Sequence, residues 1–244
     1  MQKLITILVM LLFFTTSCKK NSIIDCFNST GPITMVERPL TGFHTIILKD
    51  NINLVLVHSD TMMLKLEAGS NLMNKIITEI KDSTLTLENN NSCNWVRDFS
   101  KPVNVYLDMT LLDTLKYMSI GNVTCSDTVR NQFIQIDVHE GSGTISLLLN
   151  QNICVVNLHY GTADIVLYGK SNSCYFYQNS FGRINAIDLE AGSVYLRNWG
   201  SNDLYLYAKK FLSIEIKNIG NVYYRGNPQI NSTITGSGKL IPYN

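Results

Sequence analysis

The chain has 244 residues, of which 45% are hydrophobic and 16% are charged, and its formal net charge is +1. Such a balance argues against a disordered chain, and in the absence of a basic stripe it also argues against a nucleic-acid partner. A chain of this length can bury a sizeable core, removing on the order of 70% of its unfolded surface from water.

Residues 1–17 have the pattern of an export signal. The basic start Met1-Gln2-Lys3 precedes an apolar run from Leu4 to Phe14, which is shorter than the roughly 20 residues that span a bilayer. The run leads to Thr15-Thr16-Ser17-Cys18, which resembles a bacterial lipobox and would make Cys18 the lipid-anchored mature N-terminus. Lys19 in the next position indicates the outer membrane and leaves the face of that membrane open. Cleavage of an ordinary secretory peptide nearby is the alternative.

Five more cysteines follow the export signal, and an exported chain meets an oxidising compartment in which disulfides persist. We expect Cys26 to pair with Cys93, because both lie in irregular segments rich in Asn and Ser. The other three, Cys125, Cys154 and Cys174, lie in strand-like runs and are expected to be small buried hydrophobic residues. Because no CxxC motif occurs, the cysteines give no support to zinc binding.

Residues 18–40 contain Asn, Ser, Thr, Gly and Pro without periodicity, and they predict a tether between the membrane and the fold. From residue 41 to 110, short alternating or apolar runs separated by turn residues predict an N-terminal β subdomain. Its expected strands are Phe43–Leu48, Ile52–Val57, Met62–Leu66, Ile76–Ile80, Leu85–Leu87 and Val103–Leu107. Only Asn71–Lys75 has a brief helical pattern.

The chain repeats itself over residues 111–244, and a glycine marks each repeat. Counted from Gly121, the glycines at 141, 161, 182, 200, 220 and 238 follow at spacings of 20, 20, 21, 18, 20 and 18 residues. One such repeat has a single apolar row, which it can bury only by stacking on the next repeat. We therefore predict an all-β chain whose N-terminal subdomain continues into a single-stranded β-helix, a solenoid with a repeat of about 20 residues. A β-sandwich is the competing fold, but the hairpin turns it needs do not recur.

The chain also resembles a known family, the auto-transporter adhesin head domain, or GIN domain, of Bacteroidetes lipoproteins. The resemblance rests on these stretches: FHTIILKDNINLVLV from Phe43, LKLEAG from Leu64, TLTL from Thr84, CNWVR from Cys93, Gly141-Ser142-Gly143, YRGNP from Tyr224 and Gly236-Ser237-Gly238. It covers about residues 41–244 and implies a β-strand N-terminal part that runs into a β-helix. It suggests adhesion by name, and it supplies no catalytic residues.

Two sets of polar residues near the glycines could carry chemistry. Counted three residues beyond successive glycines, Asp164, Asn185 and Asp203 would form a column like those with which some β-helix enzymes bind calcium or cleave sugars. Because an uncharged Asn separates the two carboxylates, a solvated polar column is the favoured interpretation. His139 and His159 would meet on successive coils, but two imidazoles without a third ligand are a weak metal signal. We expect no catalytic residue, no cofactor and no metal.

Aromatic residues recur in the repeats, and six of them are candidates for a binding face: Tyr175, Tyr177, Tyr195, Trp199, Tyr205 and Tyr207. Such rings can stack on sugars or grip a protein, although tyrosine is equally a good strand residue. A separate pattern resembles the O-glycosylation motif of Bacteroidetes and occurs at Asp60-Thr61-Met62, Asp82-Ser83-Thr84, Asp113-Thr114-Leu115 and Asp127-Thr128-Val129.

Together these observations favour a non-enzymatic cell-envelope lipoprotein that is held on the membrane by lipid and acts as an adhesion module for a glycan or a protein. A structural or sensory component of the periplasm is the alternative. A polysaccharide-active β-helix enzyme is less favoured, because an enzyme needs ionisable groups that converge in a cleft, and here they are scattered. The sequence leaves the oligomeric state open.

Overall fold

The computed structural model describes residues 29–58, 63–92, 101–108, 110 and 112–243. Over these residues the chain forms strands that join in one hydrogen-bonded sheet, together with a 3-10 helix at Met73–Lys75. The strands are Ile33–Pro39 (β1), Thr45–Asp50 (β2), Ile52–Val57 (β3), Met63–Gly69 (β4), Ile76–Lys81 (β5), Thr84–Asn89 (β6), Val103–Asp108 (β7), Thr114–Ser119 (β8), Val123–Cys125 (β9), Phe133–Gly141 (β10), Thr144–Leu158 (β11), Asp164–Gln178 (β12), Ile184–Asn198 (β13), Leu204–Ile216 (β14), Val222–Arg225 (β15), Gln229–Ile234 (β16) and Leu240–Pro242 (β17). The all-β prediction is confirmed, and the helix lies inside the predicted segment.

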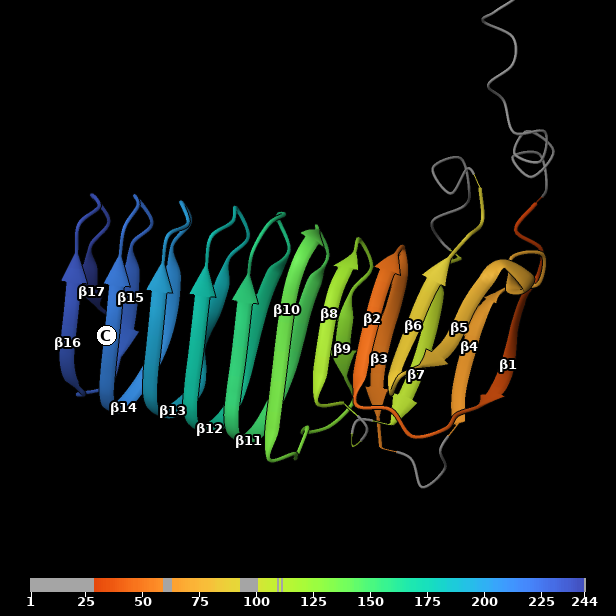
Figure 1. Ribbon diagram of the computed structural model, residues 1–244, viewed down its shortest axis with the longest axis horizontal. Helices are drawn as coiled ribbons and strands as arrows, with labels where there is room; N and C mark the ends of the chain where they lie inside the picture. Colours follow the sequence, from red (N-terminus) through yellow and green to blue (C-terminus); the bar gives the residue numbers. More distant parts are fainter. Residues whose placement is uncertain (1–28, 59–62, 93–100, 109, 111, 244) are drawn as a thin grey trace, which may run out of the picture.

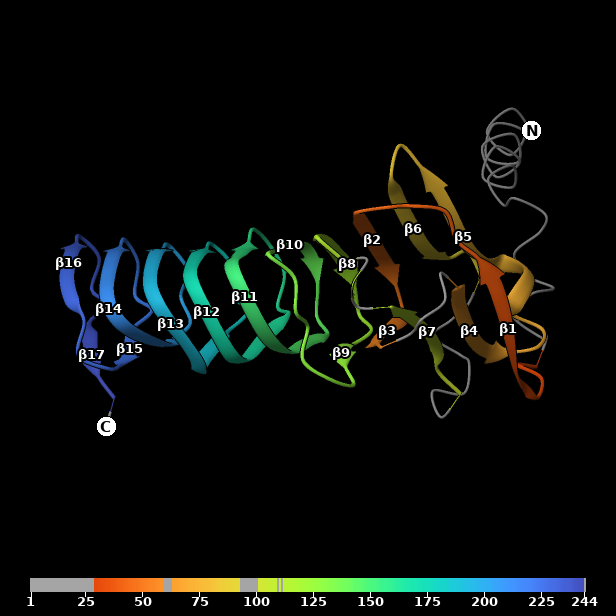
Figure 2. The same ribbon diagram turned by 90° about the horizontal axis from the view of Figure 1, so that it is seen from below.

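The strands wind into a β-solenoid of about six turns, whose coils stack in parallel (Figure 1). The stacked coils form two rows of strands, called row A and row B here. Strands β11, β12 and β13 each span 15 residues, and the first half of each strand belongs to row A and the second half to row B (Figure 2). In row A, Ile145 of β11 pairs with Ile165 of β12, and this row also contains β3, β7, β9, β15 and β17. In row B, Cys154 pairs with Cys174, and this row also contains β2, β6, β8, β10 and β16.

The core lies between the two rows, because every second residue of each strand points inward. In β12, Ile165 and Leu167 from row A face Cys174 and Phe176 from row B, and all four are buried. Strands of neighbouring coils lie about 4.8 Å apart, so each inward side chain packs against its equivalents on the coils before and after it. The hydrophobic row that one coil cannot bury alone is therefore continuous through the molecule.

The coils do not follow one another in strict chain order at the N-terminal end. Strand β2 pairs in parallel with both β6 and β8, and β3 pairs in parallel with both β7 and β9. The coil made of β2 and β3 is thus inserted between a later coil, β6 with β7, and the coil of β8 with β9. Parallel stacking consequently continues across residue 110, where the repeats were predicted to begin.

Antiparallel strands close the N-terminal end. Strand β1 pairs with β4, β4 pairs with β7, and β5 pairs with β6. The Arg38 guanidinium of β1 donates hydrogen bonds to the carbonyl oxygens of Ile76 (2.8 Å) and Met73 (3.1 Å). The prediction that residues 18–40 form only a tether is therefore wrong for residues 33–39, because these residues find a partner strand at the end of the stack.

The coil corners explain the recurrent glycines. Each corner has two positions at which the chain passes close to the previous coil, and they are two residues apart. A Cβ on Gly161 would lie 2.6 Å from the carbonyl oxygen of Gly141, and one on Gly143 would lie 2.2 Å from that of Gly121. The glycines thus belong to two separate columns, so counting from one glycine to the next shifts the alignment at some corners.

Candidate functional site

The outer surface of row B carries a groove of about 840 Å³ that crosses β11, β12, β13, β14 and β16. Rings line part of it, namely His159, Tyr175, Tyr177, Tyr195 and Trp199. The lining also contains neutral polar side chains (Asn157, Ser213, Asn231 and Thr233), one charge of each sign (Arg197 and Glu215) and three apolar residues (Phe176, Leu196 and Ile214). Because the rings and polar side chains project outward from strands whose opposite faces are packed into the core, the backbone beneath the groove is rigid.

Two tyrosines stack across neighbouring coils at the groove. Tyr175 and Tyr195 are in register, their ring centroids are 4.9 Å apart and their planes differ by 8°. Because each ring covers one face of the other, the ring edges and hydroxyl groups, rather than both flat faces, remain for a ligand. The next residue in the same column is Ser213, so the column of tyrosines ends there, although the Tyr195 ring also contacts Phe211 of β14, with centroids 5.7 Å apart. The groove extends past Ser213 to Asn231 and Thr233 of β16.

A second line of rings runs along the other margin of the groove. His139 stacks on His159 at 5.0 Å with planes 6° apart, and His159 in turn contacts Tyr177 at 5.5 Å. Tyr177 meets Trp199 edge to face at 5.5 Å. The predicted approach of the two histidines is confirmed, but within the described ranges no three His, Cys, Asp or Glu side chains gather as metal ligands would.

An ionic cluster holds the indole of Trp199 in place. Its Nε1–H donates to Glu215 Oε2 at 3.2 Å, and the Lys217 ammonium lies 4.2 Å from the ring centroid. Lys217 also forms an ion pair with Glu215 at 3.0 Å, and the hydrogen bonds from Lys217 and Trp199 lower the pKa of the Glu215 carboxyl. A carboxyl group with a lowered pKa is ionised at neutral pH and is a poor general acid. Glu215, the carboxylate in the groove lining, is thus engaged by Lys217 and Trp199.

The six aromatic residues predicted as one binding face are divided between two sides of the molecule. Tyr175, Tyr177, Tyr195 and Trp199 lie together in row B, as described above. Tyr205 and Tyr207 belong to row A, where Tyr205 stacks on Tyr223 at 4.9 Å and the guanidinium of Arg225 lies 5.3 Å from the Tyr207 ring. Sequence alternation shows which residues share a face of one strand, but it does not show which row that strand half joins.

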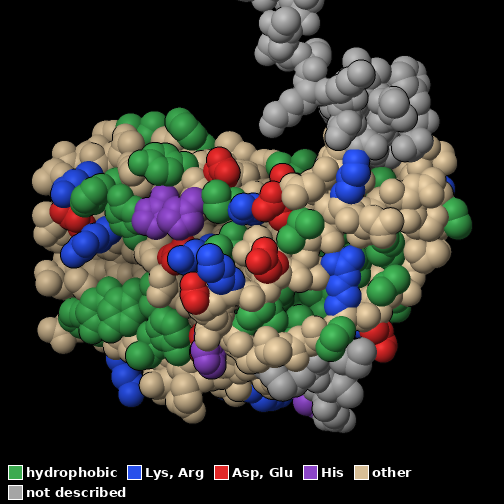
Figure 3. All heavy atoms as spheres, turned by 45° about the vertical axis from the view of Figure 1, so that its right-hand side comes forward, with side chains coloured by type: hydrophobic (Ala, Val, Ile, Leu, Met, Phe, Trp, Pro, Cys, Tyr) green, Lys and Arg blue, Asp and Glu red, His purple; other side chains and the backbone are tan. Residues whose placement is uncertain are grey.

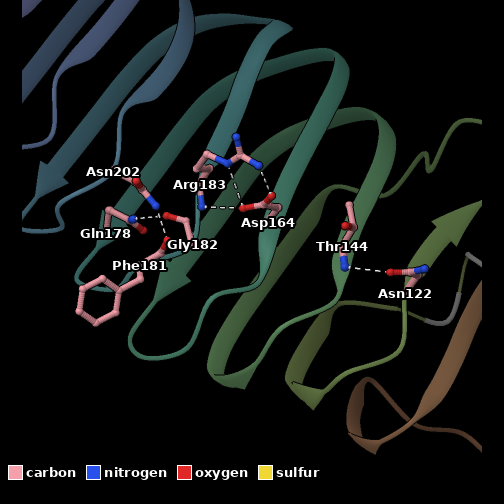
Figure 4. A network of polar contacts seen from close by, with 8 residues as sticks. All are labelled: Asn122, Thr144, Asp164, Gln178, Phe181, Gly182, Arg183 and Asn202. Atoms are coloured by element: carbon pink, nitrogen blue, oxygen red, sulfur yellow. Dashed lines mark hydrogen bonds and ion pairs between the residues drawn. The ribbon is translucent and has the colours of Figure 1, made fainter.

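The structure corrects the predicted column of Asp164, Asn185 and Asp203. Asn185 pairs with Val166, whereas the residue that follows Asp164 in the column is Arg183. The Arg183 Nη2 lies 2.7 Å from Asp164 Oδ2, and its backbone N–H donates to Asp164 Oδ1 at 3.1 Å (Figure 4). The hydrogen bond and charge of Arg183 hold the pKa of Asp164 below its usual value.

The rest of this column has the same role of fixing the corners. The backbone N–H of Thr144 donates to Asn122 Oδ1 at 3.0 Å, as Figure 4 shows, and the N–H of Asn221 donates to Asp203 Oδ1 at 2.9 Å. Each side chain thus accepts a hydrogen bond from the backbone of the next coil. The carboxylates are engaged in the scaffold, which accounts for them without calcium binding or sugar cleavage.

Comparison with known proteins places the chain in a family. Residues 42–228 match the family described as putative auto-transporter adhesin, head GIN domain. The chain belongs to this family. The resemblance noted from the sequence is thereby confirmed over more than three quarters of the chain. No curated protein matches it.

Three solved structures share the fold of this GIN domain. A putative adhesin from Bacteroides fragilis superposes with a TM-score of 0.78 at 19% identity, covering 87% of this chain and 97% of that one. A putative lipid binding protein from Parabacteroides distasonis has a TM-score of 0.69 at 18% identity, covering 88% and 98%. A putative adhesin from the same species has a TM-score of 0.63 at 17% identity, covering 87% and 98%. None of these structures is described as an enzyme.

The prediction of buried cysteines is confirmed for Cys154 and Cys174 and only in part for Cys125. Cys154 and Cys174 are buried and unpaired by disulfides, and Cys125 is partly buried. The hydrogen bond between the Cys154 and Cys174 thiols, together with burial, raises the pKa of Cys154. Cys18, Cys26 and Cys93 lie outside the described residues, as does the first Asp-Thr motif at Asp60. Over the described part of the chain, no helix is long and apolar enough to span a membrane.

Sequence reasoning missed the polar half of the groove. These residues, Ser213, Glu215, Asn231 and Thr233, are common strand residues without any motif. They join the tyrosines in the groove only because β14 stacks on β13 and β16 stacks on β14. Arg197 could have been found, since it stands two residues after Tyr195 and therefore shares its face. The face displayed in Figure 3 carries acidic and basic side chains interspersed, which agrees with the absence of a basic stripe in the sequence.

Proposed function

We propose that this GIN domain is a non-enzymatic binding module of the cell envelope, anchored by lipid at Cys18, which holds a glycan in the groove of row B. The observation that carries the proposal is the groove itself, about 840 Å³ in volume, where aromatic edges face neutral amides and hydroxyls. Ligand sites combine apolar walls with a few placed polar groups in this way.

The chemistry of the lining favours a glycan over an apolar peptide. Tyrosine hydroxyls, the amides of Asn157 and Asn231 and the hydroxyls of Ser213 and Thr233 both donate and accept hydrogen bonds, as sugar hydroxyl groups do. Because the two charges in the lining have opposite signs, the groove does not select a strongly acidic chain. A sugar ring can pack beside Tyr195 over Ser213, where the column changes from tyrosine to serine.

Binding can be tested with a matched pair of substitutions, Tyr195→Ala in the groove and Tyr205→Ala on row A. Both tyrosines stack on a neighbouring tyrosine at 4.9 Å, and each contacts one further ring, Phe211 beside Tyr195 and Tyr243 beside Tyr205, so the two variants lose comparable contacts of the scaffold. The probes are fluorescent mannans, glucans, galactans and mucin glycans, offered to the purified full chain. We expect Tyr195→Ala to weaken binding about tenfold or more, which corresponds to about 1.4 kcal/mol, while Tyr205→Ala binds like the parent chain.

The same probes offered to intact cells distinguish an adhesin from a component inside the periplasm. A domain exposed on the outer surface binds large polysaccharides on intact cells, whereas a periplasmic one binds them only after the outer membrane has been permeabilised. Equal loss of binding in the two tyrosine variants, or no binding of any probe by the purified chain, would refute the groove as a glycan site.

A further inference from the structure

The edge strands at the two ends of the solenoid differ in protection. At the N-terminal end, β1 contains Glu37, Arg38 and Pro39, and β5 contains Glu79 and Lys81. Charged residues and prolines on an edge strand block the addition of another strand. The N-terminal end is therefore protected against association through its edges.

At the C-terminal end, only one of the two edge strands is protected. Strand β17 in row A has three residues and ends at Pro242. Strand β16 in row B has the sequence Gln-Ile-Asn-Ser-Thr-Ile, without a charge or a proline, and all six residues are exposed. Among the described residues its strand pairing is with β14, while β17 pairs with β15, which leaves the other edge of β16 open.

The core is also incomplete at β16. Ile230 and Ile234 are in register with Leu212 and Ile216, which are fully buried, so they occupy inward positions of the core row. They are nevertheless 40% and 44% exposed, because no further coil covers them. Ser232 stands between them, in register with the buried Ile214. A long, uncharged edge with open apolar positions is the kind that a further strand covers.

We propose that β16 pairs with β16 of a second copy of this chain, forming a two-fold symmetric dimer joined end to end. Identical strands related by a two-fold axis are antiparallel, and facing residues must project to the same side. With the axis passing through Ser232, Ile230 of one copy faces Ile234 of the partner subunit, and Ser232 faces its own equivalent. This register completes the core row at both ends, whereas an axis through Asn231 would place Ile230 opposite a serine.

The properties of the two ends of the solenoid together indicate that the partner of β16 is a second copy of this chain. Since β16 carries no charge, two copies meet without repulsion between like charges. Since β1 and β5 are protected, the open end of one copy cannot add to the closed end of another, which excludes a filament and leaves the closed pair. The groove residues Asn231 and Thr233 project outward from β16, so two grooves would meet across the axis as one longer surface. The dimer itself does not depend on what the groove binds.

Cysteine cross-linking tests the register in the full chain, expressed with its own signal sequence in a Gram-negative host. We expect Ser232→Cys to yield a product of twice the chain mass on brief oxidation, because the two thiols face each other across the axis. Ser142→Cys is the matched control, an exposed serine at a corner far from β16, and it should stay at single mass like the parent chain. The pair Ile230→Lys and Ile234→Lys, added to Ser232→Cys, should abolish the product by placing four charges at the contact.

Two results would overturn the dimer. One is that Ser232→Cys remains at single mass while its thiol reacts readily with a maleimide, which shows that the edge is free. The other is a cross-linked product of a different mass, which shows that another protein supplies the strand.

Discussion

Removal of one buried amide, in Asn198→Ala, measures how much the coil corners contribute to stability. Asn198 is fully buried, its Nδ2 donates to the carbonyl oxygen of Gly220 at 2.9 Å, and its Oδ1 accepts from the N–H of Gly200 at 3.2 Å. Alanine leaves both backbone groups inside the corner without these partners. Gln178 performs the equivalent role one coil earlier, donating to the carbonyl oxygen of Gly182 at 2.6 Å (Figure 4).

The expected loss follows from the two orphaned groups. Each buried donor or acceptor that loses its partner costs about 1 to 3 kcal/mol, so the free energy of unfolding should fall by about 2 to 6 kcal/mol. For a chain of this size that lowers the melting temperature by about 4 to 24 °C. The assay is guanidinium unfolding of the full chain followed by circular dichroism, with the m-value compared because stacked coils can unfold in parts.

A second asparagine at the same corner provides the control. Asn202 also donates from Nδ2 to a backbone carbonyl, that of Phe181, but this contact lies at the surface, where water can replace it. Asn202→Ala should therefore change the free energy of unfolding by less than about 0.5 kcal/mol. If the two variants differ by less than about 1 kcal/mol, the reasoning that buried amides hold the corners is wrong.

Two further predictions test the corners. Gly143→Ala should destabilise the fold by about 2 kcal/mol or more in the same unfolding assay, since its Cβ would lie 2.2 Å from a backbone oxygen, whereas Gly42→Ala, with nothing within 4 Å, should be neutral. For Asp164, the folded pKa lies below the unfolded value of about 3.9. Its contribution is present above that pH and is lost as the pH falls through the folded pKa. Arg183→Gln should flatten this acid dependence, and an unchanged pH profile below about pH 4 would contradict the role of the pair.

Much of the fold could be predicted because each coil of a solenoid has its own local sequence pattern. Alternation located the strands, and the recurrence of small residues located the corners, since both are set within one coil. The order of the first coils could not be predicted in this way. The runs that form β2 and β6 look alike, and only the pairing of β2 with both β6 and β8 determines that the earlier coil is inserted. Strand β1 was missed because its partner, β4, lies about thirty residues away.

The candidate site was predicted only in part, because sequence spacing does not show which residues of neighbouring coils stack on one another. Gly161 and Gly182 look equivalent in the sequence, but they occupy different corner columns, since Gly182 stacks on Ala163. Counting from them gave Asn185 in place of Arg183, an error of two positions that converted an ion pair into a candidate metal column. Similarly, Tyr195 and Tyr205 lie ten residues apart, half a coil, and therefore on opposite sides of the core.

Stacking also distinguishes the outer surface of row B at the groove from that of row A. In a parallel stack, identical side chains in one column pack against one another, as Tyr175 does with Tyr195, and leave little of their surface for a ligand. On row A the equivalent column, Tyr205 with Tyr223, is closed by Tyr243, whose ring lies across both at 5.8 and 6.4 Å. On row B the column changes from tyrosine to serine, and although Phe211 contacts Tyr195, the space over Ser213 belongs to the groove. The surface of a solenoid should therefore bind ligands where a column of stacked side chains changes from one residue type to another. The substitution Ser213→Tyr would continue the tyrosine column across β14 and should close this groove.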